Sequence, residues 1–378
     1  MAPPPASVKD LEITTVKITR IEPIVVRIPR APEEASSGFG GKSWTTIDTL
    51  LVKVETDAGI TGWGEAFGYN IIPATKAAIE TTIAPLVVGR DATQIEPMMA
   101  ELHHKLHIFG RSGPAIFGLG GIDIALWDIA AKRAKLPLHE LLGGTSHPDL
   151  PVYASLMPYT TAPAITAIMK KVLSEGYEYV KLHETTASAT RAARAAAPDV
   201  KLMLDTNCPW TQAEALAMAE QLQECNLHWL EEPCWPPENY AALARVREVS
   251  GIPIAAGENA TTVMQFQHMF EYGAVDIAQP SPTKIGGVTE LRKVATLAAA
   301  HNVTVIPHTP YFGPGFLAGL QFSATLPRRT PIEWLYASQV TTLYGDAIVP
   351  KRGRIAIPTG IGLGFEPDPA VIEKYREA

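Results

Sequence analysis

Val200-Lys201-Leu202-Met203-Leu204-Asp205 is an apolar run that ends in an acid, and the pattern recurs twice downstream. Leu227-His228-Trp229-Leu230 precedes Glu231, and Ile252 to Gly257 precedes Glu258. Each run is typical of a buried parallel strand. The acids follow one another at the interval of one strand-plus-helix unit, which predicts a barrel whose strand C-termini converge on one face. We therefore expect the three acids to point into a common space.

Three carboxylates in one space repel one another unless a cation neutralises them. A hard divalent ion with oxygen ligands would do so and would leave positions open for substrate oxygens; Mg2+ is expected before Ca2+ or Mn2+. For any single acid at a strand end, a helix N-cap is the alternative. Three acids in register instead favour a metal centre formed by Asp205, Glu231 and Glu258.

Strands and helices alternate from Val152 onward, which predicts an α/β fold. Eight candidate strands, the number that a closed barrel needs, are Val152–Leu156, Tyr179–His183, Lys201–Asp205, His228–Glu231, Pro253–Gly257, Val275–Gln279, Val303–Pro307 and Pro331–Trp334. Amphipathic helices are expected between them, for example at 212–223 and 288–301.

The N-terminal part has a different pattern. Residues 13–26 and 46–55 are strand-like and predict an antiparallel sheet; the glycine-rich segment between them is either a lid or a surface loop. Helical periodicity follows at 74–86, 94–107 and 121–134. The expected organisation is a leader at 1–10, an N-terminal domain at 11–148, the barrel at 149–335 and a tail at 336–378 that returns to the N-terminal domain.

Composition narrows the class of protein. The 378-residue chain has a formal net charge of −7 and no basic run, which argues against nucleic acid or an anionic membrane as a partner. Its three cysteines show no paired framework, as expected in a reducing compartment. Residues 1–10 do not resemble a signal peptide, and the sequence shows no uninterrupted apolar span of membrane length. A cytoplasmic protein is predicted.

Basic residues are expected at the same barrel face. Alternation along strand 179–183 sends Lys181 and His183 to the same side, and His308 follows the seventh candidate strand, roughly across the barrel. Histidine can exchange protons near neutral pH, so these groups are candidates for acid and base. The alternative is a lysine reaching solvent beside a packed histidine. Glu333, on the eighth strand, could hydrogen-bond an enolate if protonated or pair with a basic residue.

Several motifs together resemble one family, the enolase superfamily, mandelate racemase subgroup. The residues that carry this resemblance are Leu204-Asp205-Thr206-Asn207, Leu230-Glu231-Glu232-Pro233, Gly257-Glu258-Asn259, Lys284-Ile285-Gly286-Gly287-Val288-Thr289, His308, Gly62-Trp63-Gly64-Glu65 and Gly121-Ile122-Asp123-Ile124-Ala125-Leu126-Trp127-Asp128. The resemblance covers almost the whole chain after the leader. It is specific for the fold and the metal site, and much less so for the substrate.

The resemblance implies a modified (β/α)7β TIM barrel with an N-terminal α+β capping domain, whose loops 30–43 and 65–69 would close over a small carboxylate substrate. It implies abstraction of the proton α to a carboxylate, with Mg2+ stabilising the resulting enediolate. It also implies a homo-oligomer. Asn207 and Lys284 match polar residues around the site, and Glu333 matches an acid that hydrogen-bonds the enediolate. Phe39, Trp44, Phe67 and Tyr69 are the aromatic residues expected in the lid.

This chain departs from the family pattern at two positions. Lys181-Leu182-His183 stands where the family usually has Lys-x-Lys. Ser281 stands where an acid commonly backs the histidine of the seventh strand. A serine does not stabilise imidazolium as a carboxylate does, so His308 is expected to be a weaker base than in the family pattern.

The leading hypothesis is a Mg2+-dependent hydro-lyase that dehydrates a sugar acid to a 2-keto-3-deoxy acid. His308 is favoured as base and His183 as acid, with Lys181 steering the substrate carboxylate or His183. The alternative is an isomerase, either a racemase or epimerase or a lactone cycloisomerase, that uses the same enediolate. A third hypothesis, a barrel that binds metal and ligand without turnover, has less support because all the expected groups are present together.

Overall fold

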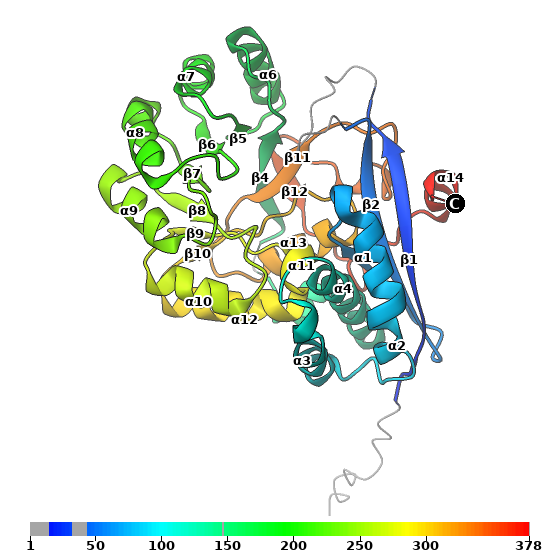
Figure 1. Ribbon diagram of the computed structural model, residues 1–378. Coiled ribbons are helices and arrows are strands. Elements are labelled where there is room, and N and C mark those ends of the chain that lie inside the picture. The colour runs from blue at the N-terminus through cyan, green and yellow to red at the C-terminus, as the bar shows by residue number, and fades with distance from the viewer. Residues whose placement is uncertain (1–14, 32–43, 146, 378) are drawn as a thin grey trace, which may run out of the picture.

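The computed structural model describes residues 15–31, 44–145 and 147–377. An N-terminal antiparallel sheet with its own helices packs beside a larger unit of alternating strands and helices (Figure 1). Phe39 and most of the predicted loop 30–43 lie outside the described residues.

The N-terminal sheet is antiparallel, and its strands in the described residues are, in spatial order, β1 (Ile18–Pro29), β2 (Thr46–Thr56) and β3 (Thr61–Ala66). The sequence predicts the first two strands but does not single out β3. Leu50 on β2 pairs with Ala66. Because this pairing holds the chain in the sheet as far as Ala66, the loop predicted at 65–69 begins only at Phe67.

Helix α4 (Pro114–Ala134) packs across this sheet. The helix begins well before the predicted start at Gly121. The prediction started too late because the glycine-rich first half has a low helix propensity. Tertiary packing explains these glycines. A Cβ atom on Gly121 would lie 2.6 Å from Cγ2 of Val52, and one on Gly64 would lie 1.8 Å from the carbonyl oxygen of Gly121. The absence of side chains therefore lets α4 lie directly on the sheet.

Helix α4 is the only helix in the described ranges that is long and apolar enough to cross a bilayer. The sequence pattern indicates no uninterrupted apolar span of that length. Within the protein, 78% of the most apolar window of α4 is buried. This burial is what the core helix of a globular protein shows. The other helices of this part are α1 (Ile72–Ala78), α2 (Ala84–Val87), α3 (Ile95–Leu106) and α5 (Leu138–Leu141). The helix predicted at 74–86 is interrupted by a π-helical turn at Ile79–Ile83.

The larger unit contains eight parallel strands in the part of the chain that the structure describes, and each overlaps a predicted strand. They are β4 (Asp149–Leu156), β5 (Tyr179–His183), β6 (Lys201–Asp205), β7 (Trp229–Glu231), β8 (Ile254–Ala256), β9 (Ile277–Ala278), β10 (Thr304–Val305) and β11 (Ile332–Tyr336). Hydrogen-bonded neighbours follow the order β10-β9-β8-β7-β6-β5-β4-β11. Just beyond β10, the hydroxyl of Thr309 donates to the carbonyl oxygen of Glu333 on β11 at 3.1 Å, which joins the two ends of this ladder.

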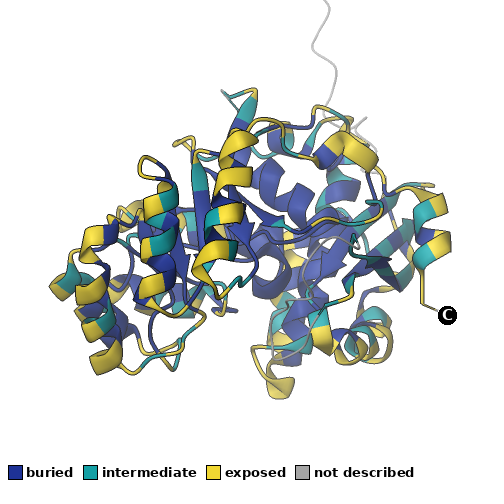
Figure 2. Ribbon diagram, turned by 90° about the horizontal axis from the view of Figure 1, so that it is seen from above, coloured by how far each residue is buried: buried dark blue, intermediate teal, exposed yellow. Residues whose placement is uncertain are grey.

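Helices cover the outside of the strands, with exposed outer turns and buried inner sides (Figure 2). They are α6 (Ala162–Ser174), α7 (Ala187–Ala196), α8 (Gln212–Leu222), α9 (Tyr240–Ser250), α10 (Val263–Glu271), α11 (Pro282–Ile285), α12 (Val288–Ala300) and α13 (Pro314–Ala324). A separate apolar cluster fills the inside of the barrel: Tyr153, Met203, Trp229, Ala255, Ile277 and Ile306. The predicted fold class is confirmed as a (β/α)7β barrel with an α+β cap.

The tail runs from the barrel to the N-terminal sheet. No long helix follows β11 in the described residues; the chain instead forms β12 (Arg354–Ala356), which pairs antiparallel with β4. The last helix, α14 (Pro369–Tyr375), lies against β1 (Figure 1). The backbone N–H of Glu377 donates to the carbonyl oxygen of Val25 at 2.9 Å.

The close approach of α4 to the sheet makes a testable prediction. Gly64→Ala should lower the free energy of unfolding by roughly 3 kcal/mol, at the upper end of the cost of overpacking, because its Cβ would meet a backbone oxygen that cannot rotate away. Urea denaturation measures this change. Gly59→Ala is the control: its Cβ would meet no atom within 4 Å, and only the positive φ of 72° opposes it, a cost of about 1–2 kcal/mol. Equal losses for the two variants would contradict the packing argument.

Candidate active site

The three predicted acids converge at one end of the barrel. Asp205 and Glu231 are the last residues of β6 and β7 and are direct partners in the strand register. Glu258 follows β8 after Gly257, whose φ of 133° suits a residue without a side chain. One oxygen from each of these acids lies within 4.8 Å of one oxygen of each other acid. The arrangement can hold one metal ion between three carboxylates.

Lys181 lies fully buried at the base of this group. Its Nζ is 2.7 Å from Oε1 of Glu231, 2.9 Å from Oε1 of Glu333 and 3.2 Å from Oδ2 of Asp205. Burial alone would lower the pKa of the ammonium, but the charges of Glu231 and Glu333 raise the pKa well above its usual value. The alternative that Lys181 reaches solvent is therefore wrong. Glu333 takes the second of its two predicted roles, as partner of a basic residue.

The carboxylates carry more negative charge than Lys181 balances. Burial raises the pKa of Asp205, but the charges of Lys181 and His183 outweigh burial and hold that pKa below its usual range. Burial, followed by the nearby Asp205 carboxylate, raises the pKa of Glu231 well above its usual value. One acid of this buried group therefore resists ionisation, because positive charge is lacking. A hard divalent cation prefers oxygen ligands and would supply that charge. The residues present thus fit Mg2+.

His183 is the last residue of β5, where alternation places it on the same side as Lys181. Its Nε2 lies 3.1 Å from Oδ2 of Asp205. Its Nδ1 lies 2.5 Å from the carbonyl oxygen of Leu156 at the end of β4. The ring is therefore fixed from both sides, with one nitrogen toward the backbone and the other toward the acids.

His308 follows β10 and approaches the acids from another side. Its Nε2 is 2.8 Å from Oε2 of Glu258, and its Nδ1 is 3.3 Å from the hydroxyl oxygen of Tyr311. Ser281, after β9, is fully buried and contacts that same hydroxyl oxygen with its Oγ at 2.5 Å. Tyr311 is a partner that the sequence did not indicate.

Two further predicted residues lie around the acids. Nζ of Lys284 is 3.3 Å from Oε1 of Glu258 and 3.1 Å from Oδ1 of Asn259, and it lies 4.8 Å from the ring centroid of Phe67. Asn207 has a left-handed φ of 52°, and its backbone N–H donates to Oδ1 of Asp205 at 3.0 Å. This contact fixes the Asp205 carboxylate.

A cavity of about 390 Å³, within the usual range for ligand sites, opens over these groups. The predicted residues that line it are Tyr69, His183, Asn207, Glu258, Lys284, His308 and Glu333. Phe67, expected in the lid, also lines the cavity. The sequence analysis did not single out the remaining lining residues, which are Phe117, Ser155, Asn259, Pro310 and Leu335. Trp44 does not line the cavity; its ring packs on Tyr69 with the centroids 4.7 Å apart.

Glu232 is a second buried acid that the sequence analysis did not use, although Leu-Glu-Glu-Pro contains it. Burial, followed by the charge of Glu258, raises the pKa of Glu232 to about 8. Its Oε2 accepts a hydrogen bond from Nδ2 of Asn259 at 2.8 Å. Glu232 therefore lies beside the three clustered carboxylates but is not one of them.

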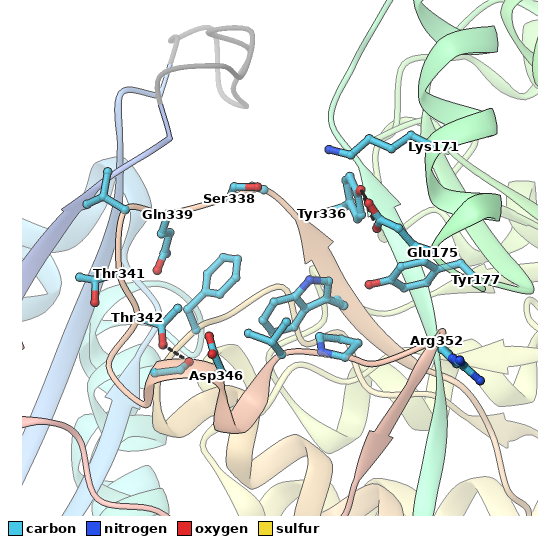
Figure 3. A pocket seen from close by; sticks show the side chains of 17 residues that line it. Lys171, Glu175, Tyr177, Tyr336, Ser338, Gln339, Thr341, Thr342, Asp346 and Arg352 are labelled. Carbon is cyan, nitrogen blue, oxygen red and sulfur yellow. Dashed lines mark hydrogen bonds between the residues drawn. The ribbon is translucent and has the colours of Figure 1, made fainter.

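A larger cavity, of about 690 Å³, lies elsewhere, on the outer side of β11 (Figure 3). Its wall includes Tyr336, whose hydroxyl donates to Glu175 at 2.8 Å and whose ring lies 5.4 Å from Nζ of Lys171. None of the three clustered carboxylates lines it. Size alone would therefore select the wrong cavity for the chemistry.

The comparison with protein families agrees with this geometry. Residues 164–371 match the family described as enolase C-terminal domain-like, and residues 24–143 match the N-terminal domain of mandelate racemase and muconate lactonizing enzyme. The chain belongs to the mandelate racemase subgroup of the enolase superfamily.

Relatives in this subgroup have more than one activity. The chain is 31% identical to D-galactarolactone cycloisomerase of Agrobacterium fabrum, over 97% of this chain and 99% of that protein. It is 28% identical to arabinonate dehydratase of Saccharolobus solfataricus, over 87% and 91% of the two chains. A racemase structure from Streptomyces coelicolor with bound magnesium superposes with a TM-score of 0.83 at 26% identity, covering 95% of this chain and all of the other. Members of the superfamily bind Mg2+.

The metal site makes a second prediction. Glu231→Gln should weaken Mg2+ binding by on the order of 100-fold or more, because it removes one of three carboxyl ligands and leaves Lys181 with fewer partners. Isothermal titration with MgCl2 measures the affinity.

Glu232→Gln is the matched control at the neighbouring position. Its carboxyl group is not one of the three clustered acids, and its Oε2 is paired with Nδ2 of Asn259 at 2.8 Å, so the amide should leave Mg2+ affinity unchanged within a few-fold. If Glu231→Gln bound Mg2+ as tightly as the unaltered protein, the three-carboxylate site would be wrong.

Proposed function

We propose that this protein is a Mg2+-dependent hydro-lyase that removes the proton α to a carboxylate and dehydrates a sugar acid to a 2-keto-3-deoxy acid. One observation carries the proposal: two histidines approach the carboxylate group from different strands and line the same cavity. His183 contacts Asp205 at one end of the group, and His308 contacts Glu258 at the other. A substrate carbon between them would have a proton-exchanging group on each side.

The acids and Lys181 prepare this site for an anionic intermediate. When bound, the dication would supply positive charge beside the substrate carboxylate, which lowers the energy of the enediolate. Asp205, Glu231 and Glu258 would hold it. Lys181 remains charged in the barrel and keeps Glu333 ionised and in place, since these two side chains lie 2.9 Å apart.

The proposed reaction balances without a redox partner. A histidine takes the α proton, the C–O bond at the β carbon breaks, and the departing hydroxyl gains a proton and leaves as water. The enol that remains becomes the 2-keto acid by moving one proton from oxygen to carbon. The relatives that are sugar-acid dehydratases, such as arabinonate dehydratase, support this class of reaction.

A lactone cycloisomerase is the second candidate, and the cavity gives a specific reason to keep it. Three aromatic rings, those of Phe67, Tyr69 and Phe117, and the side chain of Leu335 line the cavity. Apolar walls suit a ring-shaped substrate with fewer free hydroxyl groups than an open-chain polyol. The 31% identity to D-galactarolactone cycloisomerase supports the same class.

The remaining features extend the proposal. Carboxylate oxygens suit both Mg2+ and Mn2+; Mg2+ is placed first because a related racemase structure holds bound magnesium. We also propose a cytoplasmic homo-oligomer that acts on a small carboxylate and binds neither nucleic acid nor membrane, consistent with the net charge of −7.

A substrate screen tests the function. With MgCl2 present, at least one aldonic or aldaric acid should yield a 2-keto acid, detected as its semicarbazone, with a loss of 18 mass units in the product. Removal of metal with EDTA should abolish turnover, and added Mg2+ should restore it.

The product of the screen separates the candidates. A product of unchanged mass from a lactone or an acid would replace the lyase by the isomerase. Saturable ligand binding without exchange of the α proton in D2O, across the whole panel, would leave only a binding protein.

A further inference from the structure

Glu65 is a buried acid of the cap that the proposed chemistry does not use. It is the next-to-last residue of β3, and only 4% of it is exposed. Its Oε2 accepts a hydrogen bond from the backbone N–H of Gly315 at 2.8 Å. Gly315 lies in the first turn of α13, the barrel helix that follows the loop of His308. One side chain therefore joins the end of a cap strand to the start of a barrel helix.

Glycines on both sides of Pro314 leave room for this carboxyl group. A Cβ atom on Gly313 would lie 2.6 Å from Oε2 of Glu65, and one on Gly315 would lie 2.9 Å from it. Both distances are shorter than real Cβ atoms show. The backbone of this turn can approach Glu65 so closely because neither residue has a side chain. The contact is a specific fit between two segments that lie 250 positions apart in the chain.

Glu65 occupies this position at a cost in stability. Burial, which no basic side chain balances in the described part of the chain, raises the pKa of its carboxyl group to about 8, although the backbone N–H groups of Gly315 and Gly313 act in the opposite direction. A buried acid without a basic partner destabilises a fold. Such exceptions are expected at functional sites more than in a structural core.

Both segments that Glu65 joins lead directly to the cavity over the clustered acids. On the cap side, Phe67 follows after one residue and lines the cavity, and its ring centroid lies 4.9 Å from that of Tyr69, which also lines it. On the barrel side, His308 and Pro310 line the cavity, and the loop that carries them ends at the start of α13. Loss of the contact at Glu65 would therefore let two walls of one cavity separate.

We propose that Glu65 is a positioning residue for the substrate. By holding the end of β3 against the start of α13, its carboxyl group keeps the aromatic wall of the cap at a fixed distance from the loop of His308. Glu65 does not itself line the cavity and is not one of the clustered acids; it acts through Phe67 and Tyr69. The kinetic consequence rests on the proposed function: the contact sets the affinity for the carboxylate substrate, while the barrel residues carry out the proton transfers.

Two substitutions separate the hydrogen bond from the space that the side chain fills. Glu65→Gln keeps an oxygen that can accept from Gly315, whereas Glu65→Met keeps the volume but has no comparable acceptor. With a substrate from the screen, Glu65→Met should raise KM by about 10-fold and change kcat by less than about 3-fold. Glu65→Gln should keep KM within about 3-fold of the unaltered protein. Equal KM values for the two variants would overturn the proposal.

Asp128→Leu is the matched control. Asp128 is another buried acid of the cap, and it accepts hydrogen bonds from the backbone N–H groups of Trp63 and Leu363, each at 2.9 Å. Neither of these partners lines the cavity. Asp128→Leu should therefore lower the midpoint of urea denaturation and leave KM unchanged. If it raised KM as much as Glu65→Met does, any loosening of the cap would have this effect, and the specific role of Glu65 would be wrong.

Mg2+ binding tests whether the effect stays in the cap. Isothermal titration should give Glu65→Met the same Mg2+ affinity as the unaltered protein, because Glu65 contacts none of the clustered acids. A loss of Mg2+ affinity in this variant would place the effect on the barrel acids and contradict a role through Phe67 and Tyr69.

Hydrogen exchange tests the positioning without any substrate. In the full-length protein, mass spectrometry should find the backbone amides of residues 66–71 and 310–317 exchanging at least about 10-fold faster in Glu65→Met than in Glu65→Gln. The amides of β6 and β7 should exchange at the same rate in both. Unchanged exchange in the first two segments would show that Glu65 does not hold the walls together. If no acid is turned over, the proposed function fails, while the exchange result still decides the role of Glu65.

Discussion

A single buried ammonium is the constraint on which the catalytic face depends. Lys181 has no exposed surface and lies within 3.2 Å of Asp205, Glu231 and Glu333. Moving one unpaired charge from water into a barrel interior costs on the order of several kcal/mol, even after the surrounding protein relaxes. Neither the lysine nor the acids would therefore be stable there alone. Together they form a charged core that remains short of positive charge, and that shortage makes the site receptive to a divalent cation.

The strand pattern made this core predictable from the sequence. Residues at the ends of neighbouring parallel strands become neighbours in space, and the register confirms it, since His183 pairs with Asp205 and Asp205 pairs with Glu231. Alternation along β5 then places Lys181 on the same side as His183. These rules depend only on local backbone geometry, so the acids and basic residues could be brought together without knowledge of how the helices pack.

Contacts made by loops and by close packing were not predictable in this way. Tyr311 reaches Nδ1 of His308 because the chain turns after β10, and nothing in Pro307-His308-Thr309-Pro310-Tyr311 specifies the path of that turn. The early start of α4 depends on glycines that lower helix propensity but allow backbone contact with β3, a gain visible only in three dimensions. Phe117 was likewise missed, because it reaches the cavity from α4 and depends on how the two parts of the protein meet. Leu335 was missed for a different reason: the predicted strand stops at Trp334, whereas β11 continues to Tyr336.

The cap and the barrel contribute different groups to the cavity. The acids, Lys181 and the histidines all come from the barrel strands or the turns that follow them. Phe67 and Tyr69, in contrast, come from the cap, which is fixed to the barrel where Glu65 accepts a hydrogen bond from the backbone N–H of Gly315 at 2.8 Å. Changes in the cap can therefore alter the shape of the accepted carboxylate without disturbing the buried charges. Dehydratases and cycloisomerases both occur among the relatives that match most of this chain, as expected of a scaffold whose site residues can vary.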